Sequence, residues 1–69
     1  MKISARNKLQ GTVSDIKRGA VMANVSVKLK GGESVHAAIF VDSVDDLGLK
    51  PGDSVVVVVK STDVMLATP

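Results

Sequence analysis

The middle of the chain alternates apolar and polar residues with the two-residue period of a half-buried β-strand. Every second position of the clearest run is apolar, namely Val21, Ala23, Val25, Val27 and Leu29. The pair Gly31-Gly32 follows, and odd positions become apolar again over residues 35–41. The two segments therefore predict a β-hairpin in which both glycines adopt the positive φ that a tight turn requires.

Three further strands are predicted nearer the ends of the chain. Residues 3–16 predict a long first strand that is kinked near Gly11, with Ile3, Ala5 and Leu9 facing the interior. Residues 54–60 predict a strand that is covered on both faces, because valines occupy consecutive positions. Residues 64–66 predict a last short strand.

The alternation breaks over residues 42–53, where we predict one short helical turn over residues 44–47. Ser43 and Asp46 resemble a capping box with Asp in place of Glu. Gly48 suits the position that follows a helix, where a left-handed conformation is common.

Five strands, with one short helical turn between the third and fourth, match an all-β, five-stranded Greek-key barrel of the OB type. Leu47 and Leu49 are expected to fill its core, and "KPGD" (50–53) to form a β-turn. Another small β-barrel, or a dimer with swapped hairpins, fits the same pattern. No repeat divides the chain, so residues 1–69 are expected to form a single domain.

The composition favours stabilisation by oligomerisation. A chain of 69 residues buries little surface, yet 45% of these residues are hydrophobic. Cysteine is absent and His36 is the only histidine, which excludes disulfides and zinc sites built from thiolates or several imidazoles. Association of several copies is the remaining way to stabilise so small a domain.

The charge pattern favours a small anion over larger partners. A net charge of +2 is weak for a nucleic-acid module, and Phe40, the only aromatic residue, cannot provide the stacking surface that single strands need. The run of valines at 55–59 is too short to span a bilayer. We expect no nucleic-acid partner, no membrane partner and, without a visible secretory signal, a cytoplasmic location.

No constellation in the sequence indicates catalysis, and we expect the protein not to be an enzyme. No motif pairs His36 with a nucleophilic serine, so we interpret it as a packed or interface histidine. The aspartates of residues 42–53 fit caps and turns, and they lack the spacing of a calcium-binding loop. The glycines match neither the P-loop nor the dinucleotide-binding fingerprint.

Two clusters of hydrogen-bond donors remain, "SARN" (4–7) near the start and "KST" (60–62) near the end. The first and last strands of a barrel can lie side by side, which would bring Ser4 and Arg6 close to Lys60 and Ser61. This set contains no carboxylate, so it suits an oxyanion that only accepts hydrogen bonds. Composition and spacing equally allow Arg6 and Lys60 to be solvated surface charges.

Three segments resemble the Mop or molbindin family of small molybdate-binding proteins: "ISARNKLQGTV" (3–13), "SVDDLGLKPGD" (43–53) and "VVKSTDVMLA" (58–67). The similarity covers essentially the whole chain, and the same module occurs in a molybdate-responsive regulator and in importer ATPases. The combination of "SARN" with "KSTDVM" is its most specific part.

The resemblance implies an OB-like barrel that assembles into a hexamer, a trimer of dimers. Molybdate or tungstate would be the bound ligand, held at subunit interfaces by hydrogen bonds and charge without protein ligands to the metal. By this resemblance Ser4, Arg6, Lys60 and Ser61 contact the oxyanion, and the neighbouring subunit contributes Gly19, Ala20, Val21 and Met22. Phe40 stands where relatives often place Thr or Ser, so a hydroxyl contact there is lost.

The function implied is storage and buffering of molybdate or tungstate inside the cell, without chemistry. An OB-like interaction module that binds nucleic acid or docks on a transporter or regulator is the alternative.

Overall fold

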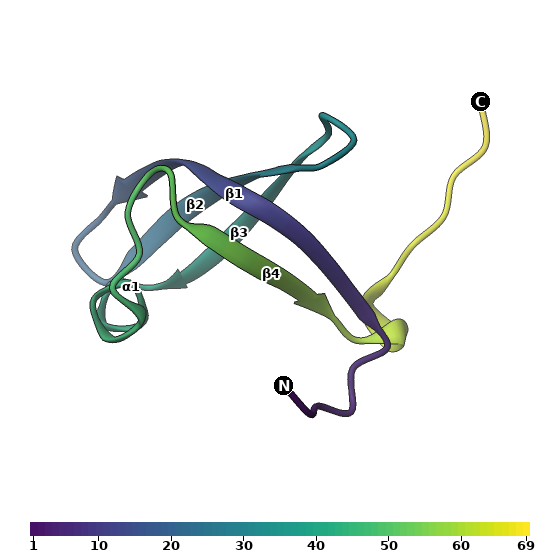
Figure 1. The fold of residues 1–69 in the computed structure, drawn as a ribbon, viewed down its shortest axis with the longest axis horizontal. Helices are drawn as coiled ribbons and strands as arrows, with labels where there is room; N and C mark the ends of the chain where they lie inside the picture. The colour runs from purple at the N-terminus through teal and green to yellow at the C-terminus, as the bar shows by residue number, and fades with distance from the viewer.

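The computed structural model describes residues 1–69 as one antiparallel, strongly curled sheet with a short helix packed at one end (Figure 1). The sheet has four strands in the order β3-β2-β1-β4. The elements are β1 (Asn7–Arg18), β2 (Met22–Leu29), β3 (Ser34–Phe40), α1 (Val41–Leu47), β4 (Ser54–Val59) and the 3-10 helix η1 (Ser61–Asp63). Neither helical segment is long or apolar enough to cross a membrane.

The core lies on the concave face of the sheet, as the alternation predicts. Its buried members come from β1, β2 and α1: Val13, Ala23, Val25, Val27 and Val44. The odd-position prediction is thus confirmed for β2, and the odd positions of β3 are half-buried. Val21 is an exception, since it precedes β2 and is 62% exposed.

A β-bulge in β1 shifts the pairing between Val13 and Asp15. Successive side chains of a strand face opposite sides, so the extra residue reverses which positions face the core. Val13 is buried and Ile16 packs against the same core, although they are three positions apart, an odd spacing that would place them on opposite faces of a regular strand. The predicted kink at Gly11 is therefore displaced to residue 14. A Cβ on Gly11 would lie 2.8 Å from the Lys28 carbonyl oxygen, which explains why glycine occupies the position.

The prediction of five strands is wrong, because residues 64–66 join no ladder within the chain. Val64 has extended backbone angles (φ −88°, ψ 128°), so the local β preference is met, but no strand of the chain pairs with it. The first strand also begins at Asn7, not at residue 3. Of the three residues predicted to face inward at this end, Ala5 is buried, whereas Ile3 and Leu9 are 50% and 42% exposed.

Helix α1 begins at Val41 and is therefore longer than the predicted turn over residues 44–47. The predicted capping box is wrong: Phe40 is the N-cap, and no side chain caps the helix. Gly48 adopts the expected left-handed conformation, with φ of 64°. Val44 is buried and Leu49 packs against the core.

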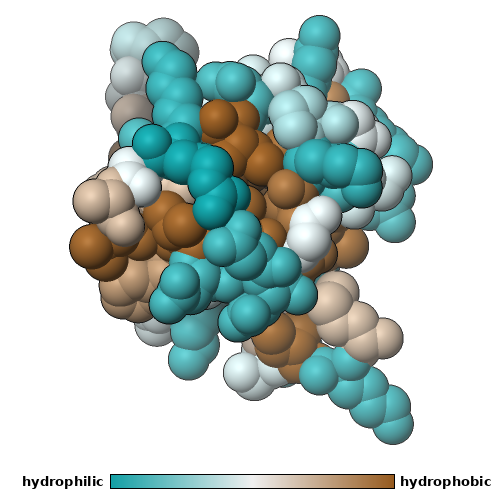
Figure 2. Space-filling view, turned by 90° about the vertical axis from the view of Figure 1, so that its left-hand side faces the viewer, coloured by the Kyte–Doolittle hydropathy of each residue, from teal (hydrophilic) through white to brown (hydrophobic).

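Leu47 does not fill the core, because it is 69% exposed. It lies three residues after Val44, at the end of a helix of less than two full turns. Val56 and Val58 of β4 are also exposed (41% and 38%), so one face of that strand is uncovered in the single chain. Figure 2 shows further apolar atoms exposed among polar ones at the end that carries α1.

The turns form as predicted from the sequence, except that one glycine lacks the predicted positive φ. The amide of Asp53 donates to the Lys50 carbonyl (3.1 Å), and Gly52 has φ of 96°, which confirms the β-turn over residues 50–53. In the β2–β3 turn Gly32 has positive φ, but Gly31 does not.

Val44→Ala should lower the free energy of unfolding by about 2 kcal/mol, because it removes two buried methyl groups and leaves a cavity. Leu47→Ala, in the same helix but at its exposed last residue, should change the free energy by less than about 0.5 kcal/mol. Urea unfolding at one fixed protein concentration measures both. Equal losses would contradict the assignment of Val44 as the residue that anchors α1.

Candidate functional site

The pairing of β1 with β4 brings the two donor clusters of the sequence together. Asn7 and Val59 form the last pair of the ladder, and Arg6 and Lys60 are the residues that directly adjoin this pair in the chain. The Asn7 side-chain amide donates to the Val59 carbonyl (3.2 Å) and closes the end of the ladder. Figure 1 shows the N-terminal segment and η1 at this same end of the sheet. We call this the terminal half-site (Ser4, Arg6, Lys60 and Ser61).

The cationic groups of the terminal half-site are not paired with carboxylates. The chain has two ion pairs, Arg18–Asp45 and Lys50–Asp53, and neither involves Arg6 or Lys60. A surface cavity of about 450 Å³ adjoins Arg6, and its lining is Ile3, Ser4, Ala5, Arg6 and Lys8. Lys60 and Ser61 lie outside that lining. Unpaired donors of this kind favour an anion, and charge-assisted hydrogen bonds are the stronger class.

Lys8 is a cavity residue that the sequence reasoning missed. The available signal was its spacing, because positions two apart on an extended segment face the same side. Lys8 therefore follows Arg6 on one side of the segment and adds a second positive charge to the cavity wall.

The second group of expected contacts forms the turn between β1 and β2, which we call the hairpin loop (residues 19–22). The amide of Gly19 donates to the Met22 carbonyl (2.8 Å), and the Val21 carbonyl accepts from the amide of Val41 (2.8 Å). Neither the amide of Ala20 nor that of Val21 donates a hydrogen bond within the chain. Two successive free N–H groups are an arrangement that binds anions.

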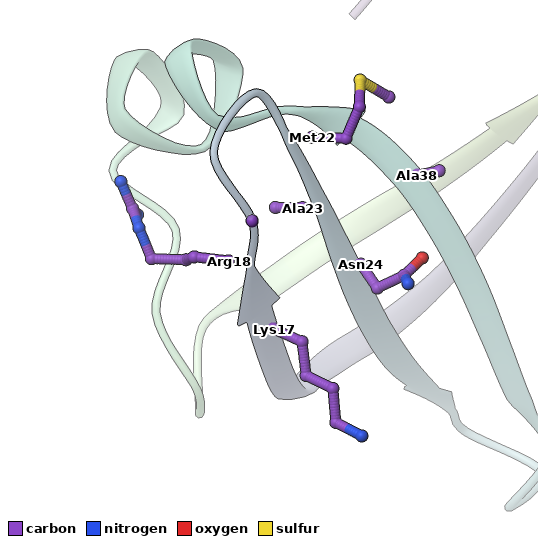
Figure 3. A pocket seen from close by; sticks show the side chains of 7 residues that line it. Lys17, Arg18, Met22, Ala23, Asn24 and Ala38 are labelled. Carbon is purple, nitrogen blue, oxygen red and sulfur yellow. The ribbon is translucent and has the colours of Figure 1, made fainter.

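A cavity of about 350 Å³ lies beside the hairpin loop (Figure 3). Gly19 and Met22 are part of its wall, together with Lys17, Arg18, Ala23, Asn24 and Ala38. Met22 is 44% exposed and pairs with Phe40 of β3, which is 59% exposed. Phe40, where the resemblance leads us to expect the loss of a hydroxyl contact, therefore adjoins the hairpin loop with an exposed aromatic ring.

The terminal half-site and the hairpin loop lie at opposite ends of β1 (Figure 1). Twelve residues of straight strand span roughly 40 Å, so even a curled β1 separates them by many times the width of a small anion. The structure thus brings Ser4, Arg6, Lys60 and Ser61 to one end and Gly19 to Met22 to the other. One chain cannot present both groups to one ligand.

His36 is exposed, so it is not a packed histidine within the chain. Its Nδ1 lies 3.0 Å from the Ser26 hydroxyl, on the polar face of the sheet. The chain has no group of three or more His, Cys, Asp or Glu side chains that could hold a metal ion.

Comparisons with known proteins show the family and the fold to which the chain is similar. Residues 3–66 match the TOBE domain family. The chain is 48% identical over 66 residues to molybdenum-pterin-binding protein 3 of Clostridium pasteurianum, covering 96% of this chain and 97% of that protein.

Two solved structures share the fold. A molybdate-binding protein from Sporomusa ovata superposes with a TM-score of 0.93 at 48% identity, covering 99% of this chain and all of the other. The cytoplasmic molybdate-binding protein ModG, with molybdate bound, gives a TM-score of 0.95 at 43% identity. This chain corresponds to 49% of the ModG chain. These relatives are named as binding proteins and not as enzymes.

Proposed function

Because the chain belongs to the TOBE domain family, and with it to the small molybdenum-pterin-binding (Mop) proteins, we propose that it binds molybdate or tungstate as an intact oxyanion. The observation that carries the proposal is the meeting of two unpaired donor clusters at the end of the β1–β4 ladder. Binding involves no bond making or breaking, and the protein stores and buffers the anion in the cytoplasm.

The donor set of the terminal half-site suits a tetrahedral dianion. Arg6 supplies a planar fork of N–H groups, Lys60 an ammonium, and Ser4 and Ser61 hydroxyl donors. A fully deprotonated oxyanion accepts from every one of these groups and needs no proton acceptor in return. Molybdate already carries its oxygen ligands, so the protein needs no side chain that coordinates the metal.

The separation along β1 supports a site shared between copies of the chain. We propose that the terminal half-site of one subunit and the hairpin loop of another enclose one anion in a homo-oligomer, with a hexamer of three dimers as the assembly. The exposed valines of β4 and the exposed apolar residues near α1 are surfaces that such contacts would cover. Burying apolar area is the principal driving force for association of this kind.

Discrimination against sulfate then follows from cavity size, because sulfate shares the charge and shape of molybdate but is smaller. Phe40 lies next to the hairpin loop and offers no hydroxyl, so the backbone N–H groups of the loop carry the contacts on that side. A site framed by two folded subunits holds its donors at fixed spacing, which a flexible loop does not.

Arg6→Ala should weaken molybdate binding by about 1.5–3 kcal/mol, the range for a hydrogen bond to a charged group. Isothermal titration of the anion-free protein with molybdate, repeated in the presence of sulfate, measures affinity and selectivity together. Lys28→Ala is the matched control, because it also removes one exposed positive charge but lies in β2, away from both ends of β1.

Absence of molybdate binding by the wild-type protein at micromolar concentration would overturn the proposed function. Equal losses for Arg6→Ala and Lys28→Ala would show that only net charge matters, and the assignment of Arg6 would then be wrong.

Mixing two variants that bind molybdate weakly should restore part of the tight binding, since the proposed site draws on two chains. Arg6→Ala damages the terminal half-site, and Ala20→Pro removes one N–H donor from the hairpin loop. In a mixed dimer one site combines both defects, whereas the other combines two intact halves. Because random co-refolding makes half of the dimers mixed, and each mixed dimer has one intact site of two, it should recover about a quarter of the wild-type capacity in equilibrium dialysis.

No recovery on mixing, although native mass spectrometry detects mixed oligomers, would contradict a shared site. A monomeric mass for the wild-type protein would contradict it as well.

A further inference from the structure

One ion pair joins the end of β1 to helix α1, directly beside the hairpin loop. The Nη2 atom of Arg18 donates to both carboxylate oxygens of Asp45, at 2.9 and 3.2 Å. Figure 3 shows the Arg18 side chain extending toward the helix, whereas Lys17 and Asn24 point away from it. Arg18 immediately precedes Gly19, so the pair fixes the residue at which the loop begins.

The backbone connects the loop to the same helix. The Val21 carbonyl accepts from the amide of Val41, the first residue of α1, at 2.8 Å. Helix α1 is itself anchored by Val44, which is 1% exposed in the core. The hairpin loop is therefore held at its start through a side chain and near its end through the backbone, and both contacts lead to the buried core.

From this geometry we propose that Arg18 and Asp45 are positioning residues for oxyanion binding, an inference that rests on the proposed function. They hold the hairpin loop so that the N–H groups of Ala20 and Val21 keep the spacing the anion requires. Neither side chain contacts the anion. The Arg18 charge is engaged by Asp45, because its Nη2 contacts both carboxylate oxygens.

The contribution of this ion pair to folding differs from its expected effect on anion affinity. The two side chains are 47% and 60% exposed, and ion pairs at that exposure contribute little to folding. Anion affinity is more sensitive than stability to loss of the pair. The donors of the loop must be ordered before the anion binds, and any cost of ordering them is subtracted directly from the binding free energy. Loss of the pair should therefore affect anion affinity more than thermal stability.

The sign of the effect provides the decisive test. Asp45→Asn removes a negative charge near the loop, so an effect of net charge alone would strengthen binding of an anion. The positioning role instead predicts weaker molybdate binding, by about two- to fivefold, with the melting temperature nearly unchanged. Asp45→Glu keeps a carboxylate within reach of Arg18 and should retain most of the affinity.

Lys50→Ala is the control, because it breaks the other exposed ion pair of the chain, Lys50–Asp53, which lies in the turn before β4. Its effect on molybdate titrations should be smaller than that of Asp45→Asn. Unchanged or tighter binding by Asp45→Asn, while the wild-type protein binds molybdate normally, would overturn the positioning role and leave the proposed function intact. Failure of the wild-type protein to bind molybdate would overturn both.

Discussion

The double pairing of β1 is the constraint on which the rest of the structure depends. Residues 7–12 of this strand pair with β4 and residues 11–18 with β2, and the bulge at residue 14 lies within the part that pairs with β2. The bulge keeps both Val13 and Ile16 on the core side, so one continuous strand curls around one core. The terminal half-site lies at one end of β1 and the hairpin loop at the other, so the length of β1 sets the distance between them.

Helix α1 links the core to the end of the sheet that carries the hairpin loop. Val44 packs under the sheet, Val41 bonds the hairpin loop, and Asp45 holds Arg18. Three residues of this short helix thus contribute a buried side chain, a backbone hydrogen bond and an ion pair. The same end exposes Phe40 beside Met22, so the local surface combines free N–H groups with an apolar wall. That combination suits an anion enclosed by protein better than one left in water, because a low dielectric strengthens the contacts that charged donors make.

The alternation of apolar residues was sufficient to predict β2 and the β2–β3 hairpin, because a period of two reflects burial of one face. The strand over residues 54–60 was predicted from its consecutive valines, and it forms over Ser54–Val59. It could not locate the bulge, which depends on pairing with β2 and not on any residue of β1 alone. The last strand was overpredicted, since residues 64–66 have the right backbone preference but no partner in the chain. The clustering of Arg6 with Lys60 was predictable from strand order, and Lys8 could have been found from its spacing to Arg6. The Arg18–Asp45 pair required the structure, because it joins residues 27 positions apart in the sequence. Leu47 was misplaced because it is the last residue of α1, where its side chain is exposed although Val44 one turn earlier is buried.

Because the two ends of β1 are far apart, a site that uses both needs two chains, and its occupancy depends on the concentration of the protein. If each anion is enclosed by two chains, it binds the assembled state and not the free subunit, so anion and assembly stabilise each other. The apparent affinity then rises with protein concentration, and dilution alone releases the anion. Such a protein responds to its own abundance as well as to the supply of its ligand. Synthesis of more chains would increase the capacity for the anion and tighten its retention at the same time.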